Sequence, residues 1–296
     1  MTAADAASRP PAPRPAPLPP LLVEDMVRAA LREDFGRAGD VTSAAVVPEA
    51  AEATAVMASR EHGVLCGADF GRAAFAAQDA GLSVELLMRD GARVAPGDVV
   101  MRISGNARAI LSGERVALNF MCHLSGIAGM TARFAEKLSG TRAHVACTRK
   151  TTPGLRAAEK YAVRCGGGVN HRFGLDDAVL IKDNHIAVAG GVAAAVTAAR
   201  AYAGHLCAIE VEVDTLAQLE EALGAGATVI MLDNFGLEDL GRAVEINAGR
   251  AVLEASGGVS LETVGAIGKT GVDVISSSKI TMAAGTLDLG LDIEIG

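Results

Sequence analysis

The sequence contains no tryptophan, few other aromatic residues and no excess of basic residues. Only 3% of its residues are aromatic, and 27 Lys and Arg face 35 Asp and Glu, giving a formal net charge of -8. Nucleic-acid-binding domains present a basic surface, often with aromatic side chains that stack on bases. This composition therefore argues against a nucleic acid as the partner.

Long apolar runs and paired cysteine motifs are also missing. No stretch of 18 uncharged apolar residues occurs, so we expect no membrane span. The cysteines are odd in number, widely spaced and without a C-x-x-C motif, which argues against a disulfide framework or a zinc site. We expect a cytoplasmic protein whose cysteines are small core residues: Cys66, Cys122, Cys147, Cys165 and Cys207.

Proline is concentrated in one segment near the N-terminus. Seven of the ten prolines fall between Pro10 and Pro20, a density that excludes a helix or a central strand. We expect residues 1–20 to form a disordered, proline-rich tail. The remaining chain is long enough for one large domain or two modest ones.

The first half of the remaining chain has mixed helix and strand patterns. Apolar residues recur at helical spacing from Leu22 to Leu31. Short strand-like runs follow at Ala53–Ala58, Leu82–Met88 and Val99–Ile103, with a helix-like stretch at Gly71–Gln78. This alternation predicts an α+β domain.

A long amphipathic helix is predicted from Ser112 past Met130, with Ser112 as its N-cap. Arg115 would then lie in the first turn, where the helix dipole repels a cation. A bound anion at this helix end would remove that conflict. Alternatively, Arg115 is a surface side chain that points away from the helix end.

The second half of the chain alternates strands and helices. Apolar runs at 208–213, 228–232, 251–254 and 272–275 are separated by helical patterns at 216–223, 237–246 and 261–267. A spacing of just over twenty residues predicts parallel strands with right-handed crossovers, in a barrel or an open sheet. In such folds the carboxyl ends of the strands carry the chemistry.

Cationic side chains gather between Thr148 and His185, although the chain as a whole is acidic. They lie beside glycines or at the ends of apolar strand runs: Arg149, Lys150, His171, Arg172 and Lys182. Lysine and arginine are usually solvated surface residues. Their placement at strand ends instead predicts a site for a small, highly anionic ligand, because arginine forks match carboxylates and phosphates.

Two carboxylates, Glu212 and Asp233, end neighbouring predicted strands. Beside a phosphate they could hold Mg2+, or they could stabilise a cationic sugar centre. The other interpretation is that they cap helices or pair with nearby lysines. Glu210, on the same face but deeper, is our second choice.

The turn Ser256-Gly257-Gly258 lies before a helix predicted to start near Ser260, so its N–H groups and the helix dipole form an anion cradle. Among the histidines, His171 follows three glycines and is expected to stay neutral and form a hydrogen bond within the cations. His185 is expected to support the site from behind.

Several long motifs in order resemble those of the quinolinate phosphoribosyltransferase family. They include G-E-R-V-A-L-N-F at residues 113–120, T-R-K-T-T-P-G at 148–154, G-G-G-V-N-H-R at 166–172 and I-K-D-N-H at 181–185. E-V-E-V-D, M-L-D-N-F and E-A-S-G-G-V follow, and the resemblance covers nearly everything after Leu21.

The resemblance implies an α/β fold with an N-terminal α/β sandwich and a C-terminal incomplete α/β barrel of parallel strands. The sandwich would comprise residues 21–125, completed by about 283–296, and the barrel residues 126–282. It also implies a homodimer, or a larger assembly of dimers such as a hexamer, in which Arg115 enters the neighbouring subunit's active site.

Site roles follow from the matching motifs. Arg149, Arg172 and Lys182 would bind the two quinolinate carboxylates, with His171 adjacent, and Lys150 would contact phosphoribosyl pyrophosphate (PRPP). Glu212 and Asp233 would serve the ribose and a Mg2+ cofactor. Ser256 and Gly257 would hold the 5-phosphate.

One loop departs from the family pattern. The family commonly has a glycine where this chain has Ser278, followed here by Lys279, in S-S-S-K-I-T-M-A. Serine still offers an N–H and a hydroxyl, so we expect PRPP binding to survive.

Three competing functions remain open from the sequence. A nicotinate phosphoribosyltransferase without decarboxylation would not need four cations, Arg115, Arg149, Arg172 and Lys182, for one carboxylate. An idle PRPP-binding or regulatory protein would bind ligand without turnover. A Schiff-base aldolase on Lys182 would need an apolar or cationic pocket around that lysine.

Overall fold

The computed structural model describes residues 15–295, which form two compact units. The first, which we call the sandwich unit, comprises residues 15–132, 152–167 and 284–295. The second, the parallel unit, comprises residues 133–151 and 168–283. Most of the predicted proline-rich tail, residues 1–14, lies outside the described residues.

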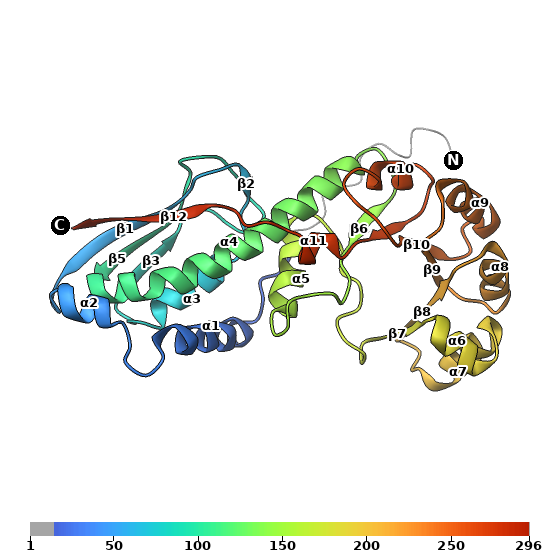
Figure 1. The fold of residues 1–296 in the computed structure, drawn as a ribbon, viewed down its shortest axis with the longest axis horizontal. Helices are drawn as coiled ribbons and strands as arrows, with labels where there is room; N and C mark the ends of the chain where they lie inside the picture. The colour runs from blue at the N-terminus through green and yellow to red at the C-terminus, as the bar shows by residue number, and fades with distance from the viewer. Residues whose placement is uncertain (1–14, 296) are drawn as a thin grey trace. The chain divides into compact units, whose positions relative to one another are not determined.

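The sandwich unit is built on a four-stranded antiparallel sheet with the order β12-β1-β5-β3 (Figure 1). Its strands are β1 (Glu52–Ser59), β3 (Ser83–Leu86), β5 (Val99–Asn106) and β12 (Leu289–Ile295). Alternate residues of β1 are buried, as expected for a sheet with one covered face. Strand β12 pairs with β1 along its length, so the C-terminus completes this sheet. Two short strands, β2 (Gly63–Val64) and β4 (Arg93–Val94), pair separately.

Helices of the sandwich unit are α1 (Pro20–Phe35), α2 (Val41–Val46), α3 (Ala68–Ala76), α5 (Arg156–Cys165) and most of α4 (Ala107–Lys137). Helix α1 confirms the predicted helical spacing, because Val23, Val27 and Leu31 are its buried residues. Pro20 occupies its first position, where a missing N–H costs nothing.

The start of α4 differs from the prediction. The helix begins at Ala107, directly after β5, and the side chain of Asn106 accepts a hydrogen bond from the backbone N–H of Ala109 at 3.2 Å. Asn106 therefore caps the helix, and Ser112 lies within it, where its hydroxyl donates to Asp40 at 2.9 Å. Arg115 is in the third turn, so the predicted conflict with the helix dipole does not exist.

The parallel unit contains six parallel strands in the order β6-β11-β10-β9-β8-β7. They are β6 (His144–Ala146), β7 (Ala178–Ile181), β8 (Ala208–Val213), β9 (Val229–Asp233), β10 (Val252–Ser256) and β11 (Val274–Ser276). The order ends with β6 and β7, and no ladder joins these two among residues 15–295. The sheet is thus an incomplete barrel, as the family resemblance implied.

Helices connect these strands and lie beside them (Figure 1): α6 (Asp183–Ala189), α7 (Val192–Tyr202), α8 (Leu216–Gly224), α9 (Leu237–Asn247), α10 (Val264–Gly268) and α11 (Lys279–Met282). Helix α8 shows how sequence sets such boundaries. Thr215 caps it by accepting from the N–H of Gln218, whose side chain accepts from the N–H of Thr215.

Strand alternation sorts the parallel sheet into two chemically different faces. One face is apolar and almost fully buried, with side chains such as Val211, Ile230, Leu232, Leu253 and Ile275. Residues at the intervening positions belong to the opposite face, because strand side chains alternate with a period of two. That opposite face carries the polar residues discussed below.

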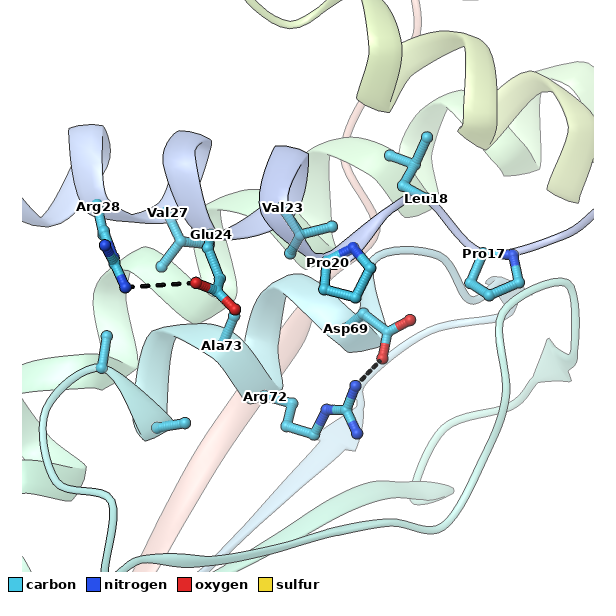
Figure 2. A pocket seen from close by; sticks show the side chains of 12 residues that line it. Pro17, Leu18, Pro20, Val23, Glu24, Val27, Arg28, Asp69, Arg72 and Ala73 are labelled. Atoms are coloured by element: carbon cyan, nitrogen blue, oxygen red, sulfur yellow. Dashed lines mark hydrogen bonds and ion pairs between the residues drawn. The ribbon is translucent and has the colours of Figure 1, made fainter.

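A groove of about 500 Å3 lies between α1 and α3 in the sandwich unit (Figure 2). Its wall is largely apolar, and the charged side chains on it are paired: Arg28 with Glu24 at 3.3 Å and Arg72 with Asp69 at 2.7 Å. This groove therefore lacks the cluster of cations that the sequence predicted for the site. Separately, none of the described helices combines the length and the apolar character needed to cross a bilayer.

Gly126 and Gly129 of α4 provide a matched test of packing in the sandwich unit. A Cβ on Gly126 would lie 1.8 Å from the backbone oxygen of Gly285, whereas a Cβ on Gly129 meets nothing within 4 Å. We predict that Gly126→Ala lowers the free energy of unfolding by about 1–3 kcal/mol. Gly129→Ala should be neutral or stabilising by up to about 1 kcal/mol. Urea unfolding measures both, and equal effects would contradict the close approach of Gly285.

Candidate active site

The register of the parallel sheet places the predicted polar residues on one face. Leu180 of β7 is level with Glu210 of β8, so Lys182 follows β7 at the level of Glu212. Glu212 is in turn level with Met231 of β9, and Asp233 ends that strand. Parallel strands end at the same edge, so these side chains meet at the carboxyl edge of the sheet.

Lys182 and Glu212 form an ion pair at this edge. Lys182 Nζ lies 2.5 Å from a carboxylate oxygen of Glu212, whose side chain is only 12% exposed. The alternative interpretation from the sequence, that a strand-end carboxylate pairs with a nearby lysine, therefore holds for Glu212. An arriving anion would compete with Glu212 for Lys182.

Asp233 lies among further charges. Burial raises the pKa of Asp233, the carboxylates of Glu212 and Asp214 raise it further, and Lys182 and Lys150 lower it. Two acidic side chains are thus held together against their mutual repulsion, and a cation between them would relieve it. Glu212 and Asp233 fit the oxygen ligands that Mg2+ accepts in proteins.

The charges of two arginines, Arg149 and Arg172, act on each other in the parallel unit. Burial lowers the pKa of Arg172, and the charge of Arg149 lowers it further, while Asp177 and Glu210 act in the opposite direction. The side chain of Arg172 donates to the carbonyl of Ala178 at 3.0 Å. Its buried Nε–H has no partner among residues 15–295. An arginine with a spare donor beside a second positive charge suits a carboxylate or a phosphate.

His171 is held in one orientation by two hydrogen bonds. Its Nδ1 accepts from the backbone N–H of Arg172 at 2.8 Å, and its Nε2 lies 2.8 Å from a carboxylate oxygen of Glu210. An acceptor at Nδ1 places the ring proton on Nε2, which donates to Glu210. The ring is therefore hydrogen-bonded through both nitrogens, which face the protein's own groups.

Glu254 joins this buried cluster. Its carboxylate lies 3.9 Å from His171 Nε2, and burial together with the charge of Glu210 raises the pKa of Glu254 to about 7. Glu210 and Glu254 come from β8 and β10, which flank β9. Their meeting indicates that the polar face is concave, because strands two apart in a flat sheet are separated by roughly 9–10 Å.

Gly257 allows two loops of the site to touch. A Cβ there would lie 2.1 Å from the side-chain oxygen of Asn234, and its φ of +93° favours glycine. Asn234, itself at a φ of 57°, donates its backbone N–H to the carbonyl of Ser256 at 3.0 Å. The loops after β9 and β10 are thus tied together, which places Asp233 beside Ser256.

The start predicted for the helix near Ser260 is wrong. Helix α10 begins only at Val264 and has five residues, because turns occupy 261–263. The Ser256-Gly257-Gly258 turn therefore offers backbone N–H groups without a helix terminus directly behind them. The anion cradle predicted there loses the contribution of a helix dipole.

Ser278 adopts an ordinary backbone conformation, with φ -74° and ψ -15°. Any residue reaches this region, so the serine at this position introduces no strain. Helix α11 follows Ser278 directly, and the hydroxyl of Thr281 in this helix donates to the carbonyl of Lys150, after β6, at 2.8 Å. The loop that departs from the family pattern thus helps to fix Lys150.

The parallel unit therefore contains all the predicted site residues except one. Arg115 belongs to the sandwich unit, where its side chain is 64% exposed and lies 4.0 Å from Glu114. Sequence reasoning missed Glu254 and Thr281. Glu254 stands two residues before Ser256, and the period of two that led to Glu210 would also have found Glu254.

Comparisons with known proteins show which family the chain belongs to. The family model of the quinolinate phosphoribosyl transferase C-terminal domain matches residues 127–292, and that of the N-terminal domain matches residues 40–125. The chain is 43% identical over 277 residues to nicotinate-nucleotide pyrophosphorylase [carboxylating] of Mycobacterium leprae, covering 91% of this chain and 96% of the relative.

A plant relative and a solved structure extend the likeness. Quinolinate phosphoribosyltransferase [decarboxylating] 2a, mitochondrial, of Nicotiana tabacum is 41% identical, with 92% of this chain and 82% of the relative covered. The crystal structure of NadC from Streptococcus pyogenes matches with a TM-score of 0.92 and 42% identity, over 95% of this chain and all of the other.

The raised pKa of Asp233 predicts a pH-dependent cost to stability. A carboxyl whose folded pKa exceeds its unfolded value keeps its proton better when folded, so stability is lost as pH rises through this interval. We predict that Asp233→Asn raises the Tm of the ligand-free protein at pH 7. At about pH 3, where the carboxyl is largely protonated in both states, the gain should vanish. A thermal unfolding series checks this, and a pH-independent difference would contradict it.

Proposed function

The chain belongs to the quinolinate phosphoribosyltransferase family, and from this premise we propose that it transfers the phosphoribosyl group of PRPP to quinolinate with decarboxylation. The products would be nicotinate mononucleotide, pyrophosphate and CO2, a step of de novo NAD biosynthesis. The two kinds of name carried by the relatives describe this reaction from opposite directions.

The adjacent guanidinium groups of Arg149 and Arg172 carry this proposal. Burial and then the charge of Arg149 lower the pKa of Arg172, so the two arginines repel each other, and a dianion would relieve that repulsion. Quinolinate offers two carboxylates on neighbouring ring carbons, which suit two arginine forks. Lys182, at the same edge of the sheet, would leave its ion pair with Glu212 and bind the anionic substrate, which adds a further positive charge to the site.

Glu212 and Asp233 would hold Mg2+, whose chemistry here is to neutralise the pyrophosphate of PRPP. Lys150 would contact the same substrate, and Ser256, Gly257 and Ser278 would offer polar groups to its 5-phosphate. The fit of the carboxylates to a cation follows from the raised pKa of Asp233 next to Glu212.

The residues then act mainly by position and charge. The C1–oxygen bond of PRPP breaks as pyrophosphate leaves, and the nearby carboxylates favour the oxocarbenium character that develops at C1. Arg149 and Arg172 hold the pyridine nitrogen in line to form the new bond to C1. The carboxylate on the ring carbon next to the nitrogen then departs as CO2, and the pyridinium accepts the electron pair left behind. The ring carbon that lost the carboxylate takes up a proton.

The alternatives are less well supported by the site. Transfer to nicotinate would leave the paired arginines with a single carboxylate. An aldolase needs a free amine at Lys182, but that lysine forms an ion pair with Glu212 at 2.5 Å. An idle binding protein is favoured by Ser278, which replaces a glycine of the family. The backbone of Ser278 is unstrained, so the serine gives no reason for a loss of activity.

An assay of the purified protein separates these functions. Quinolinate or nicotinate is supplied with PRPP and Mg2+, and nicotinate mononucleotide and CO2 are measured. We predict product from quinolinate, with one CO2 per nucleotide, and none from nicotinate. Product from nicotinate would replace the proposal with the non-decarboxylating function, and PRPP binding without product would favour the idle protein.

We further propose a homodimer, or an assembly of dimers, in which Arg115 enters the neighbouring subunit's site. Lys182→Ala and Arg115→Ala should each lose at least ~100-fold in activity, the scale of a lost preorganised charge contact. Mixing the two variants with subunit exchange should restore roughly a quarter of wild-type activity, because half of the dimers are mixed and each has one intact site.

Arg242→Ala serves as the control, since Arg242 is exposed on α9 and contacts Asp239 at 3.8 Å. This variant should retain full activity. Failure of the mixture to recover activity, with subunit exchange demonstrated, would contradict the shared site.

A further inference from the structure

The cluster of His171, Glu210 and Glu254 has no direct role in the reaction proposed above. Their ligand atoms all lie within 4.8 Å of one another, and each side chain is 10% exposed or less. Glu210 and Glu254 each keep one buried carboxylate oxygen without a hydrogen-bond partner among residues 15–295. Burying a carboxylate that lacks a hydrogen-bond partner lowers the free energy of unfolding. Such a group is therefore a candidate for a functional role.

A metal ion is the first occupant to test against this geometry, and the histidine argues against it. A metal would need the lone pair of His171 Nε2, which requires the ring proton on Nδ1. Nδ1 instead accepts the N–H of Arg172 at 2.8 Å. A proton there would set two donors against each other, so the cluster presents an N–H to Glu210 and not a metal ligand.

The hydrogen bonds instead form a chain that ends on a substrate-binding residue. Glu210 accepts from His171 Nε2 at 2.8 Å, and His171 Nδ1 accepts from the backbone N–H of Arg172. At the far end of the Arg172 side chain, Nη1 donates to the carbonyl of Ala178 at 3.0 Å. Both the backbone and the guanidinium of Arg172 are therefore anchored.

We propose that Glu210 is a positioning residue, which through His171 holds Arg172 in place to bind a substrate carboxylate. This proposal rests on the proposed function, because Arg172 is assigned there to quinolinate. His171 accordingly links Glu210 to Arg172.

Such an anchor is needed because Arg172 lies beside a like charge. Without a fixed backbone, repulsion from Arg149 would move the two guanidinium groups apart, and the pair would no longer match two neighbouring carboxylates. A displacement of about 1 Å at a substrate-positioning residue can cost on the order of 100-fold in rate.

A second histidine repeats the arrangement at Lys182. His185 Nδ1 accepts the backbone N–H of Lys182 at 2.9 Å. In both places an imidazole accepts the backbone N–H of a cation assigned to the substrate. His171 differs from His185 because it is buried and its Nε2 contacts the carboxylate of Glu210. Mutation of Glu210 therefore tests the arrangement at His171.

The test compares three variants by steady-state kinetics of the holoenzyme with quinolinate, PRPP and Mg2+. Glu210→Leu removes the acceptor and should raise the KM for quinolinate by ~10–100-fold, with the KM for PRPP changed by less than ~3-fold. Glu210→Gln keeps an oxygen acceptor and should recover most of the affinity. Arg242→Ala, at an exposed position on α9, is the control and should resemble wild type.

Equal increases in both KM values, or a lower Tm with unchanged KM values, would show that Glu210 is only structural and overturn the proposal. If Glu210→Leu does not fold, 15N NMR of the His171 ring in the wild-type protein decides the matter. We expect the proton on Nε2, and a proton on Nδ1 would refute the chain of hydrogen bonds. This measurement is independent of turnover, so it separates failure of this inference from failure of the proposed function.

Discussion

The proximity of two positive charges, Arg149 and Arg172, is the constraint on which the site depends. Burial and Arg149 together lower the pKa of Arg172, so the ligand-free protein bears an electrostatic cost there. The opposite charge accumulates nearby, where burial and then repulsion from Glu212 raise the pKa of Asp233. A site with separate repelling cations and repelling anions fits a reaction between a dianion and a metal-bound pyrophosphate ester. Stability is lost in the free protein and recovered on binding.

The fold provides the means of holding these charges. A period of two along each strand sends apolar residues such as Val211 and Leu253 to one face and acids to the other. Parallel pairing then aligns the strand ends, so residues distant in sequence meet at one edge. Close approach at Gly257 and the hydrogen bond from Thr281 to Lys150 fix the loops that carry the site.

Much of this architecture could be predicted from the sequence, because it depends on periodicity and strand order. The parallel strands follow from local patterns, whereas the incomplete barrel was implied by the family resemblance. The start of α4 could not be predicted, since Asn106 and Ser112 are both good caps and only the end of β5 selects Asn106. Helix α10 was predicted, but its start was placed too early because turns occupy 261–263.

Side-chain pairing was the least predictable property. Sequence placed Lys182 and Glu212 near each other but left open whether they pair, which depends on register and distance. Likewise, the tautomer of His171 depends on an acceptor bond to Arg172 that no spacing indicates. Function at this site therefore depends on contacts that arise only once the sheet is assembled.

The most direct measurement is the change in the Tm of the purified protein when quinolinate or nicotinate is added at equal concentration. If the adjacent arginines are prepared for two carboxylates, quinolinate raises the Tm, and nicotinate has a much smaller effect. An equal rise with both ligands would show that one carboxylate satisfies the cluster and would contradict the account.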